Sequence, residues 1–183
     1  MLRREINRVL EELPSRGPFA LELGCGHGHF LAEFARLHPN TRCLGVDYCL
    51  DRVRRAERKR VRGEFTNLRF LRAEVRDFVL AIPGEITFEQ IFVLFPDPWP
   101  KRRHRKNRFV CADLIADLDN ATSPGTRFFF RSDNPDYVSE VRDLFSRRPG
   151  WRTLAENQLP VETVSVFQEK AGAFGTMVAE KIS

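Results

Sequence analysis

The stretch FPDPWPKRRHRKNR (95–108) brings an acid, a tryptophan and a run of basic residues together. Asp97 and Trp99 alternate with prolines, and each proline fixes φ and stiffens the backbone. Six of the eight residues from 101 to 108 are Lys or Arg, and such a cluster can neutralise phosphates. We therefore expect a carboxylate beside a polyanion-binding surface. A solvated basic face is the alternative reading of the same charges.

The individual basic side chains carry specific expectations. If they contact phosphates, binding should depend strongly on salt concentration. The residues expected to do so are Arg102, Arg103, Arg105, Lys106 and Arg108, with Lys101 before them. Trp99 either packs as an anchor of the loop or touches a base, and the sequence leaves both open.

A second candidate site is the glycine-rich stretch ELGCGHG (22–28), which lies between an expected strand and an expected helix. Gly24 allows a tight turn, and Gly26 lets a ligand approach the backbone. The helix that follows offers unpaired N–H groups at its N-terminus. Asp47 ends the next expected strand, about twenty residues on, where a carboxylate can bind a ribose hydroxyl. A glycine-rich turn with a helix-capping aspartate is the alternative.

The glycine spacing argues against a dinucleotide cofactor. The dinucleotide motif is G-x-G-x-x-G, whereas Gly28 comes one residue early and Glu22 stands before the loop. A carboxylate there suits a cationic ligand better than a pyrophosphate. The pattern E-x-G-x-G-x-G resembles the first motif of the S-adenosylmethionine-dependent methyltransferases, whose cofactor carries a sulfonium and an ammonium. The cofactor contacts that this resemblance implies are Glu22, Gly24, Gly26 and Asp47, with Glu74 near the adenine.

The acidic, aromatic and basic stretch narrows the resemblance. FPDPWPKRRHRKNR is similar to the signature of the bacterial tRNA (guanine-N7-)-methyltransferases, and Asp97, Trp99 and Lys101 fall on that signature. The resemblance covers nearly the whole chain and implies methylation of a guanine at N7 in the variable loop of tRNA. The substrate-facing residues that it implies are Lys101, Asp133, Ser165 and Gln168, with Tyr137 helping to shape the pocket.

This chain differs from most members of that family near its end. Where they have Thr-Lys-Phe-Glu, it has Ser165, Val166, Phe167 and Gln168. A neutral amide should hold guanine less tightly than a glutamate, because charge-assisted hydrogen bonds are stronger than neutral ones. The departure leaves two other functions open. One is a non-catalytic RNA-binding module on a methyltransferase scaffold, and the other is a methyltransferase for another nucleobase.

The expected chemistry needs alignment more than proton transfer. Guanine N7 carries a lone pair at neutral pH, so no base has to remove a proton. The main gain comes from holding N7, methyl and sulfur in line. Positive charge moves from sulfur to the purine during transfer, and Asp97, between cofactor and base, would favour that shift as the catalytic carboxylate.

Strands that alternate with helices must position these residues. We expect strands at 19–23, 42–47, 67–71, 90–97 and 125–133, followed by edge strands of the tail at 151–157, 161–170 and 175–183. We expect helices near the N-terminus and at 29–38, 50–62, 75–81, 108–120 and 135–147. The pattern predicts an α/β fold with a Rossmann-like, doubly wound, mostly parallel sheet and an antiparallel edge. The resemblance implies the class I methyltransferase version of this fold.

Length and composition set the remaining expectations. The 183 residues predict one domain over 1–183, and the net charge of +5 favours an anionic partner. The helix expected at 50–62 is strongly basic, and it either extends the RNA-binding surface or forms a solvated face. The cysteine spacing predicts no metal site, and the apolar runs predict no membrane span. The charged N-terminus lacks a signal-peptide core, which predicts a cytoplasmic protein. A monomer and a homodimer both stay open, because the sequence does not give the oligomeric state.

Overall fold

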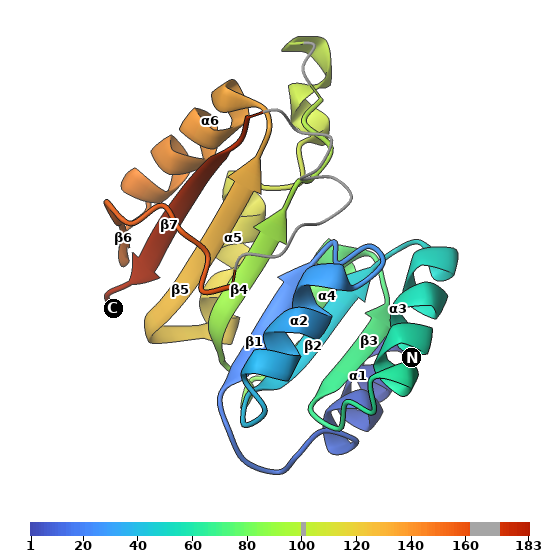
Figure 1. Cartoon of the computed structure of the whole chain (residues 1–183). Coiled ribbons are helices and arrows are strands. Elements are labelled where there is room, and N and C mark those ends of the chain that lie inside the picture. The colour runs from blue at the N-terminus through green and yellow to red at the C-terminus, as the bar shows by residue number, and fades with distance from the viewer. Residues whose placement is uncertain (100–101, 162–172) are drawn as a thin grey trace.

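A computed structural model describes residues 1–99, 102–161 and 173–183, and within these residues seven strands form one sheet (Figure 1). The strands are β1 (Phe19–Leu23), β2 (Arg42–Asp47), β3 (Leu68–Arg72), β4 (Phe88–Leu94), β5 (Thr122–Ser132), β6 (Trp151–Thr153) and β7 (Gly175–Lys181). Their order in the sheet is β3-β2-β1-β4-β5-β7-β6. β1 to β5 run parallel, whereas β7 runs antiparallel to β5 and β6, so the predicted antiparallel edge is confirmed.

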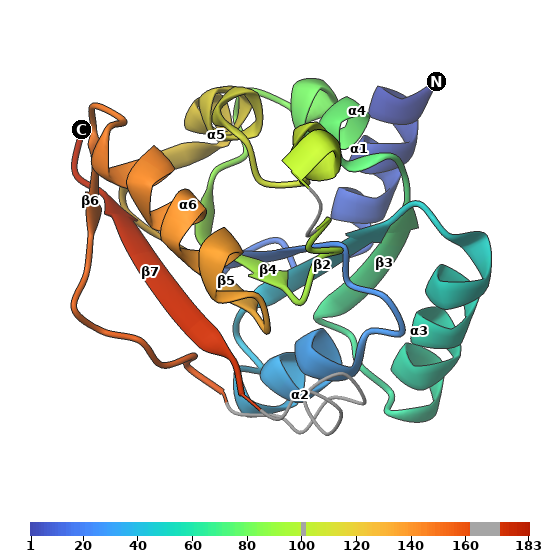
Figure 2. The ribbon, with the colours of Figure 1, turned by 90° about the horizontal axis from the view of Figure 1, so that it is seen from above.

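Helices cover both faces of this sheet. The helices are α1 (Leu2–Glu11), α2 (His29–Leu37), α3 (Leu50–Arg62), α4 (Val75–Ala81), α5 (Ala112–Leu118) and α6 (Pro135–Ser146), with short 3-10 turns η1 (Arg102–Asn107) and η2 (Asp119–Ala121). Figure 2 shows α2 and α3 on one face and α1, α4 and α5 on the other. One buried cluster packs α1, α4, α5 and α6 against the sheet, and a second packs α2 and α3 against its opposite face. The predicted doubly wound architecture is therefore confirmed.

The central strands are buried on both sides, as a sheet covered by two helical layers requires. All five residues of β1 are buried, and so are the last five of β2. From β1 the chain moves outward through β2 to β3, and then returns to β4 on the other side of β1. Ligands of such folds bind beyond the carboxyl ends of the strands at this reversal. The fold therefore places its candidate site beyond β1 and β4.

The sequence predicts most element bounds, but not those around residues 95–111. β4 ends at Leu94 rather than at Asp97, because Phe95 turns the backbone to φ 50°. The helix expected at 108–120 begins only at Ala112. The preceding residues run as a separate connection, in which the Val110 N–H donates a hydrogen bond of 2.8 Å to the Tyr137 hydroxyl.

The tail is described only in part. β6 and β7 lie within the edge strands expected there, whereas the expected strand over 161–170 falls almost entirely outside the described residues. Within the described parts of the chain, no helix combines the length and apolar character needed to cross a bilayer.

Candidate active site

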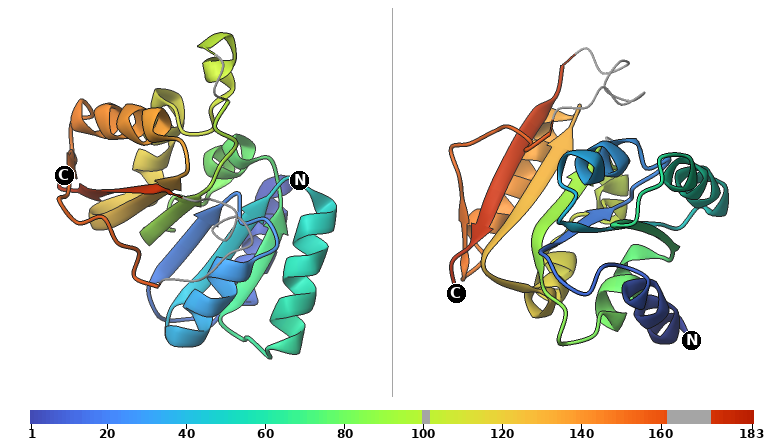
Figure 3. Two further views of the ribbon diagram at one scale, coloured as in Figure 1. Left: turned by 45° about the horizontal axis from the view of Figure 1, so that its top comes forward. Right: turned by 60° about the horizontal axis from the view of Figure 1, so that its bottom comes forward.

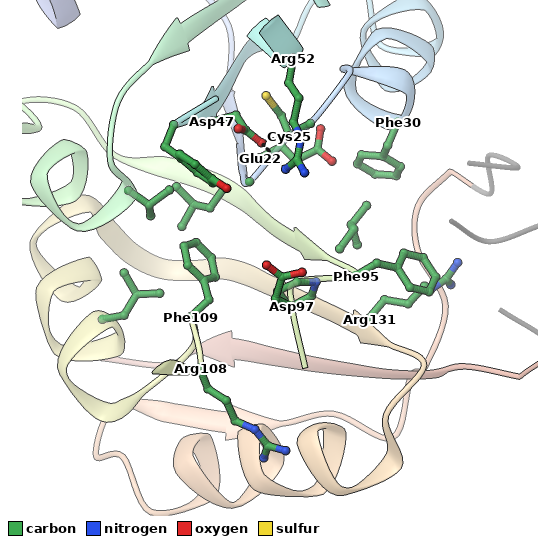
Figure 4. A pocket seen from close by; sticks show the side chains of 18 of the residues that line it. Glu22, Cys25, Phe30, Asp47, Arg52, Phe95, Asp97, Arg108, Phe109 and Arg131 are labelled. Carbon is green, nitrogen blue, oxygen red and sulfur yellow. Dashed lines mark hydrogen bonds and ion pairs between the residues drawn. The ribbon is translucent and has the colours of Figure 1, made fainter. Parts of the chain in front are cut away.

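A cavity of about 530 Å³ opens beyond the carboxyl ends of β1, β2 and β4 (Figure 4). Four of the predicted site carboxylates line it, and they come from four different segments of the chain. They are Glu22, Asp47, Glu74 and Asp97. The fold thus brings the predicted cofactor residues and the predicted catalytic carboxylate together at one place.

Backbone conformation requires glycine at three positions of the loop at 22–28, and close packing requires it as well at one of them. Gly24, Gly26 and Gly28 have φ values of 76°, 53° and 67°, in the left-handed region that L side chains rarely adopt. A Cβ on Gly24 or Gly26 would meet nothing within 4 Å, so backbone conformation sets the requirement there and the space above the loop is open. A Cβ on Gly28 would lie 2.5 Å from the Phe70 ring, so packing adds a second constraint at that position.

Asp47 holds the glycine loop in place. One of its carboxylate oxygens accepts a hydrogen bond of 2.9 Å from the Gly26 N–H, and the other accepts one of 2.8 Å from the Cys49 N–H. Arg52 adds an ion pair at 3.8 Å. The carboxylate therefore joins the end of β2 to the loop and to the start of α3. The predicted ribose contact of Asp47 stays a prediction.

Glu22 is a buried acid that faces the cavity. Its side chain is buried, and among the described residues its Oε2 atom has no hydrogen-bond partner. Burial raises the pKa of this carboxyl to about 8, because the charged form loses its hydration, and the charge of Asp47 acts in the same direction. A buried, unpartnered carboxylate oxygen is costly, and a cationic group in the cavity would offset that cost.

Glu74 caps α4 at the rim of the cavity. Its Oε2 accepts hydrogen bonds of 2.8 and 3.1 Å from the N–H groups of Arg76 and Asp77. Such a cap satisfies N–H groups that the first turn of a helix cannot pair internally. The residue lines the cavity, as predicted, while its contact with an adenine stays a prediction.

Asp97 sits in a loop whose backbone is strained and anchored. Phe95 and Trp99 have φ values of 50° and 41°, and strain of this kind persists only where the surroundings impose it. The Phe95 N–H donates a hydrogen bond of 2.8 Å to the Arg131 carbonyl, and Arg108 Nε donates one of 3.0 Å to the Pro98 carbonyl. The loop thereby presents Asp97 to the cavity, with its carboxylate pointing toward Glu22 (Figure 4).

Arg108, expected to contact phosphates, is buried in this structure. Its side chain is only 1% exposed, and it forms an ion pair with Glu140 as well as lying over the Tyr137 ring, 4.5 Å from the centroid. A buried guanidinium paired in this way braces the Asp97 loop against α6, although it also lines the cavity and its Nη2 has no hydrogen-bond partner among the described residues. Its predicted phosphate contact stays a prediction. Tyr137 itself is fully buried beneath Arg108, so it supports this bracing rather than shaping the pocket wall.

The other predicted substrate and RNA residues are less fully placed. Arg103 is exposed, and its Nε donates a hydrogen bond of 3.2 Å to His104 Nε2. Asp133 is exposed at the end of β5 and is not among the residues that line the cavity. The backbone of Arg102, Arg105 and Lys106 forms η1. Lys101, Ser165 and Gln168 lie outside the described residues.

The sequence of this chain matches known methyltransferases. A sequence model of a family of putative methyltransferases matches residues 16–178. The tRNA (guanine-N(7)-)-methyltransferase of Thermosynechococcus vestitus is 31% identical over 164 residues, which cover 90% of this chain and 76% of that protein. This chain belongs to the tRNA (guanine-N(7)-)-methyltransferase family.

Two further comparisons give the extent of the likeness. The family member from Geobacter metallireducens is 33% identical over 141 residues, which cover 75% of this chain but 65% of that protein. The crystal structure of the 16S rRNA methyltransferase KamB superposes with a TM-score of 0.67 at 15% identity, covering 98% of this chain and 94% of that one. The last likeness establishes that the fold is that of the class I methyltransferases.

The family implies S-adenosylmethionine as cofactor, and the cavity fits that group. The unpartnered Glu22 oxygen suits an ammonium, and the open space over Gly24 and Gly26 lets a ligand approach the backbone. Among the described residues, no group of three or more His, Cys, Asp or Glu side chains is placed to hold a metal ion.

Sequence reasoning misses Arg131, which lines the cavity from β5. Its side chain is buried, its Nε donates a hydrogen bond of 2.9 Å to Thr176 Oγ1, and its guanidinium lies 4.6 Å from the centroid of the Phe174 ring. The Phe174 ring in turn lies edge-on to Phe95, with their centroids 5.9 Å apart. One sequence signal could have indicated Arg131, because it directly follows three phenylalanines in an expected buried strand. Charged residues buried in this way concentrate at functional sites.

Proposed function

We propose that this protein transfers a methyl group from S-adenosylmethionine to N7 of a guanine in the variable loop of tRNA. The observation that carries the proposal is the placement of Glu22 and Asp97 on one cavity, in a chain of this family. The buried acid suits the cationic end of the methyl donor, and the loop carboxylate lines the same cavity, where we expect the substrate base to enter.

The cofactor side of the cavity would use four groups of this chain. Glu22 would accept a hydrogen bond from the cofactor's ammonium, and the backbone of Gly24 and Gly26 would pack against the ligand. Asp47, already bonded to the Gly26 N–H, has acceptor capacity left for a ribose hydroxyl. Glu74 would lie near the adenine from the start of α4. Bound there, S-adenosylmethionine would supply the methyl group as a sulfonium, which needs no activation by a metal.

The substrate side would depend on Asp97. Its carboxylate would accept hydrogen bonds from the guanine edge and favour the positive charge that develops on the purine. The anchored loop would hold this group still, so that little reorganisation accompanies the reaction. Lys101, Asp133, Ser165 and Gln168 remain our candidates for other contacts with the substrate. Arg102, Arg103, Arg105 and Lys106 remain candidates for phosphate contacts around it.

The decisive experiment is methyl transfer followed by nucleoside analysis. Bulk tRNA lacking the modification is incubated with the protein and methyl-labelled S-adenosylmethionine, and is then digested to nucleosides. We expect the label in N7-methylguanosine. Label in another nucleoside would show that the substrate base is wrong, and tRNA binding without any label would favour a non-catalytic RNA-binding protein.

A further inference from the structure

A second charged surface, separate from the stretch 95–108, lies on α3. This helix carries seven basic side chains and two acidic ones over thirteen residues. Val53 and Ala56 are its buried residues, so the helix packs on the sheet through a narrow apolar stripe and turns its charges outward. A helix so unbalanced in charge repels itself, and that cost suggests a use for the charge.

The two acids and Asp47 neutralise only part of this charge. Arg60 pairs with Glu57 at 2.8 Å, Arg54 with Asp51 at 4.0 Å, and Arg52 with Asp47 at 3.8 Å. Three exposed arginines of α3 form no ion pair with any described residue. They are Arg55, Arg58 and Arg62.

The unpaired arginines share one face of the helix. Their spacing of three, four and seven residues places them side by side, one per turn of about 5.4 Å. Lys59 lies on the same side, and its Nζ donates a hydrogen bond of 3.1 Å to the His27 carbonyl while forming no ion pair within 4.0 Å of a described acid. The result is a positively charged stripe, which we define as Arg55, Arg58, Lys59 and Arg62.

This stripe is continuous with the rim of the cavity. His27 and His29 belong to the rim, and Lys59 joins the stripe to them. Burial lowers the pKa of His27, and the positive charges of Arg55, Arg52 and Lys59 lower it further. Arg52, one turn before Arg55, lines the cavity itself beside Glu22 and Asp47 (Figure 4). A polyanion that inserts a base into the cavity can therefore lie across α3 without a gap in positive charge.

We propose that the α3 stripe binds the phosphate backbone of the RNA substrate and extends the RNA-binding surface from the cavity along the α2–α3 face. The inference rests on the proposed function and specifies where the rest of the RNA lies. Charge complementarity selects a polynucleotide, because the stripe is made of arginines and a lysine at regular spacing. An anionic membrane would also need several large apolar side chains among them, whereas the exposed apolar side chains of α3 are only Leu50 at its start and Val61.

The test variant removes three positive charges from the stripe, as Arg55→Gln, Arg58→Gln and Arg62→Gln together. Binding of unmodified tRNA transcript is measured by fluorescence anisotropy over a series of salt concentrations. Each lost phosphate contact should lower the slope of log Kd against log salt by about 0.7–0.9, so we expect a loss of about 2–3. We also expect binding at least tenfold weaker at ~0.15 M salt.

The matched control removes the same charge elsewhere, as Arg3→Gln, Arg4→Gln and Arg16→Gln. All three are exposed, and they lie on α1 and in the turn before β1. Figures 2 and 3 show α1 on the face of the sheet opposite α3. We expect the control to keep the wild-type salt slope. Both variants should keep wild-type affinity for S-adenosylhomocysteine, which verifies the cofactor side of the cavity.

The outcomes separate this inference from the proposed function. If the wild type forms N7-methylguanosine but the stripe variant binds tRNA with the wild-type slope, the α3 inference is overturned alone. A control variant that loses as much slope as the stripe variant overturns it too. If the stripe variant keeps tRNA binding but loses binding to phosphatidylserine vesicles, a membrane replaces RNA as the ligand. Slope loss confined to the stripe variant supports the inference even if the wild type transfers no methyl group.

Discussion

At the scale of single residues, Glu22 combines burial, an unpartnered oxygen and a pKa raised to about 8. At neutral pH most molecules without ligand therefore carry a protonated Glu22. A cationic ligand favours the carboxylate, so binding must remove that proton. The cost of removing it decreases as the pH rises toward the pKa, because more of the protein is then already ionised.

This gives the first prediction. Affinity for S-adenosylhomocysteine should increase about fivefold between pH 7 and pH 8, and binding at pH 7 should release close to one proton. Calorimetric titrations in buffers of different ionisation enthalpy measure both quantities. Glu22→Gln should bind more weakly and lose the pH dependence, and an unchanged pH profile in that variant would assign the effect to another group.

A second prediction concerns Asp97. Because its carboxylate is expected to act on charge that develops during transfer, Asp97→Asn should lower kcat by roughly 10²-fold. Binding of S-adenosylhomocysteine should change much less, since Glu22 and the glycine loop would carry most of the cofactor contacts. Single-turnover transfer and calorimetry provide the two readouts. Near-normal turnover by Asp97→Ala, with cofactor binding intact, would remove Asp97 from the reaction.

At the scale of elements, local sequence signals predict the cofactor half of the site well. The bounds of β1, β2, α3 and α4 follow from apolar periodicity and from the turn residues between them. The connection from 95 to 111 is different, because its shape depends on contacts far away in the chain. Phe95 bonds to Arg131, Arg108 pairs with Glu140, and Val110 bonds to Tyr137. No local pattern in the basic stretch distinguishes the buried Arg108 from the exposed Arg103.

The role of Arg108 can be tested against the phosphate role that its sequence context suggested. Arg108→Gln should destabilise the fold by roughly 1–3 kcal/mol, because it removes a buried hydrogen-bond partner from a half-buried glutamate. It should also lower kcat, since the Asp97 loop loses its brace. Urea unfolding and methyl-transfer rates give these values. The salt slope of tRNA binding should stay at the wild-type value, and a slope reduced by about one would restore Arg108 as a phosphate contact.

At the scale of the whole molecule, chemistry and stabilisation lie at opposite edges of the sheet. The cavity occupies the carboxyl edge, while Asp119 gathers Arg148, Trp151 and Lys181 near the other edge of β5 and β7. Burial alone would raise the pKa of Asp119, but hydrogen bonds from these three side chains outweigh it and lower that pKa. That the whole chain folds as one domain remains a prediction.

The Asp119 cluster supplies a stability prediction. A folded-state pKa below the unfolded value gives stability above the unfolded pKa, and this stability is lost as the pH falls through the folded pKa. Asp119→Asn should therefore cost roughly 1–3 kcal/mol at pH 7 and progressively less below about pH 4. Denaturant unfolding at pH 7 and at a pH below about 4 checks this, with Glu85→Gln as an exposed control. An equal cost at both pH values would show that charge is not the cause.

The anchoring of the Asp97 loop has a consequence for how such proteins diversify. The residues expected to face the methyl donor follow β1, β2 and β3, whereas the Asp97 loop is bonded to β5 and, through Arg108, to α6. Substitutions in the Asp97 loop can therefore change the substrate side of the cavity while the residues after β1, β2 and β3 keep their geometry. Descendants of such a scaffold can acquire new acceptor molecules without first rebuilding their hold on the donor.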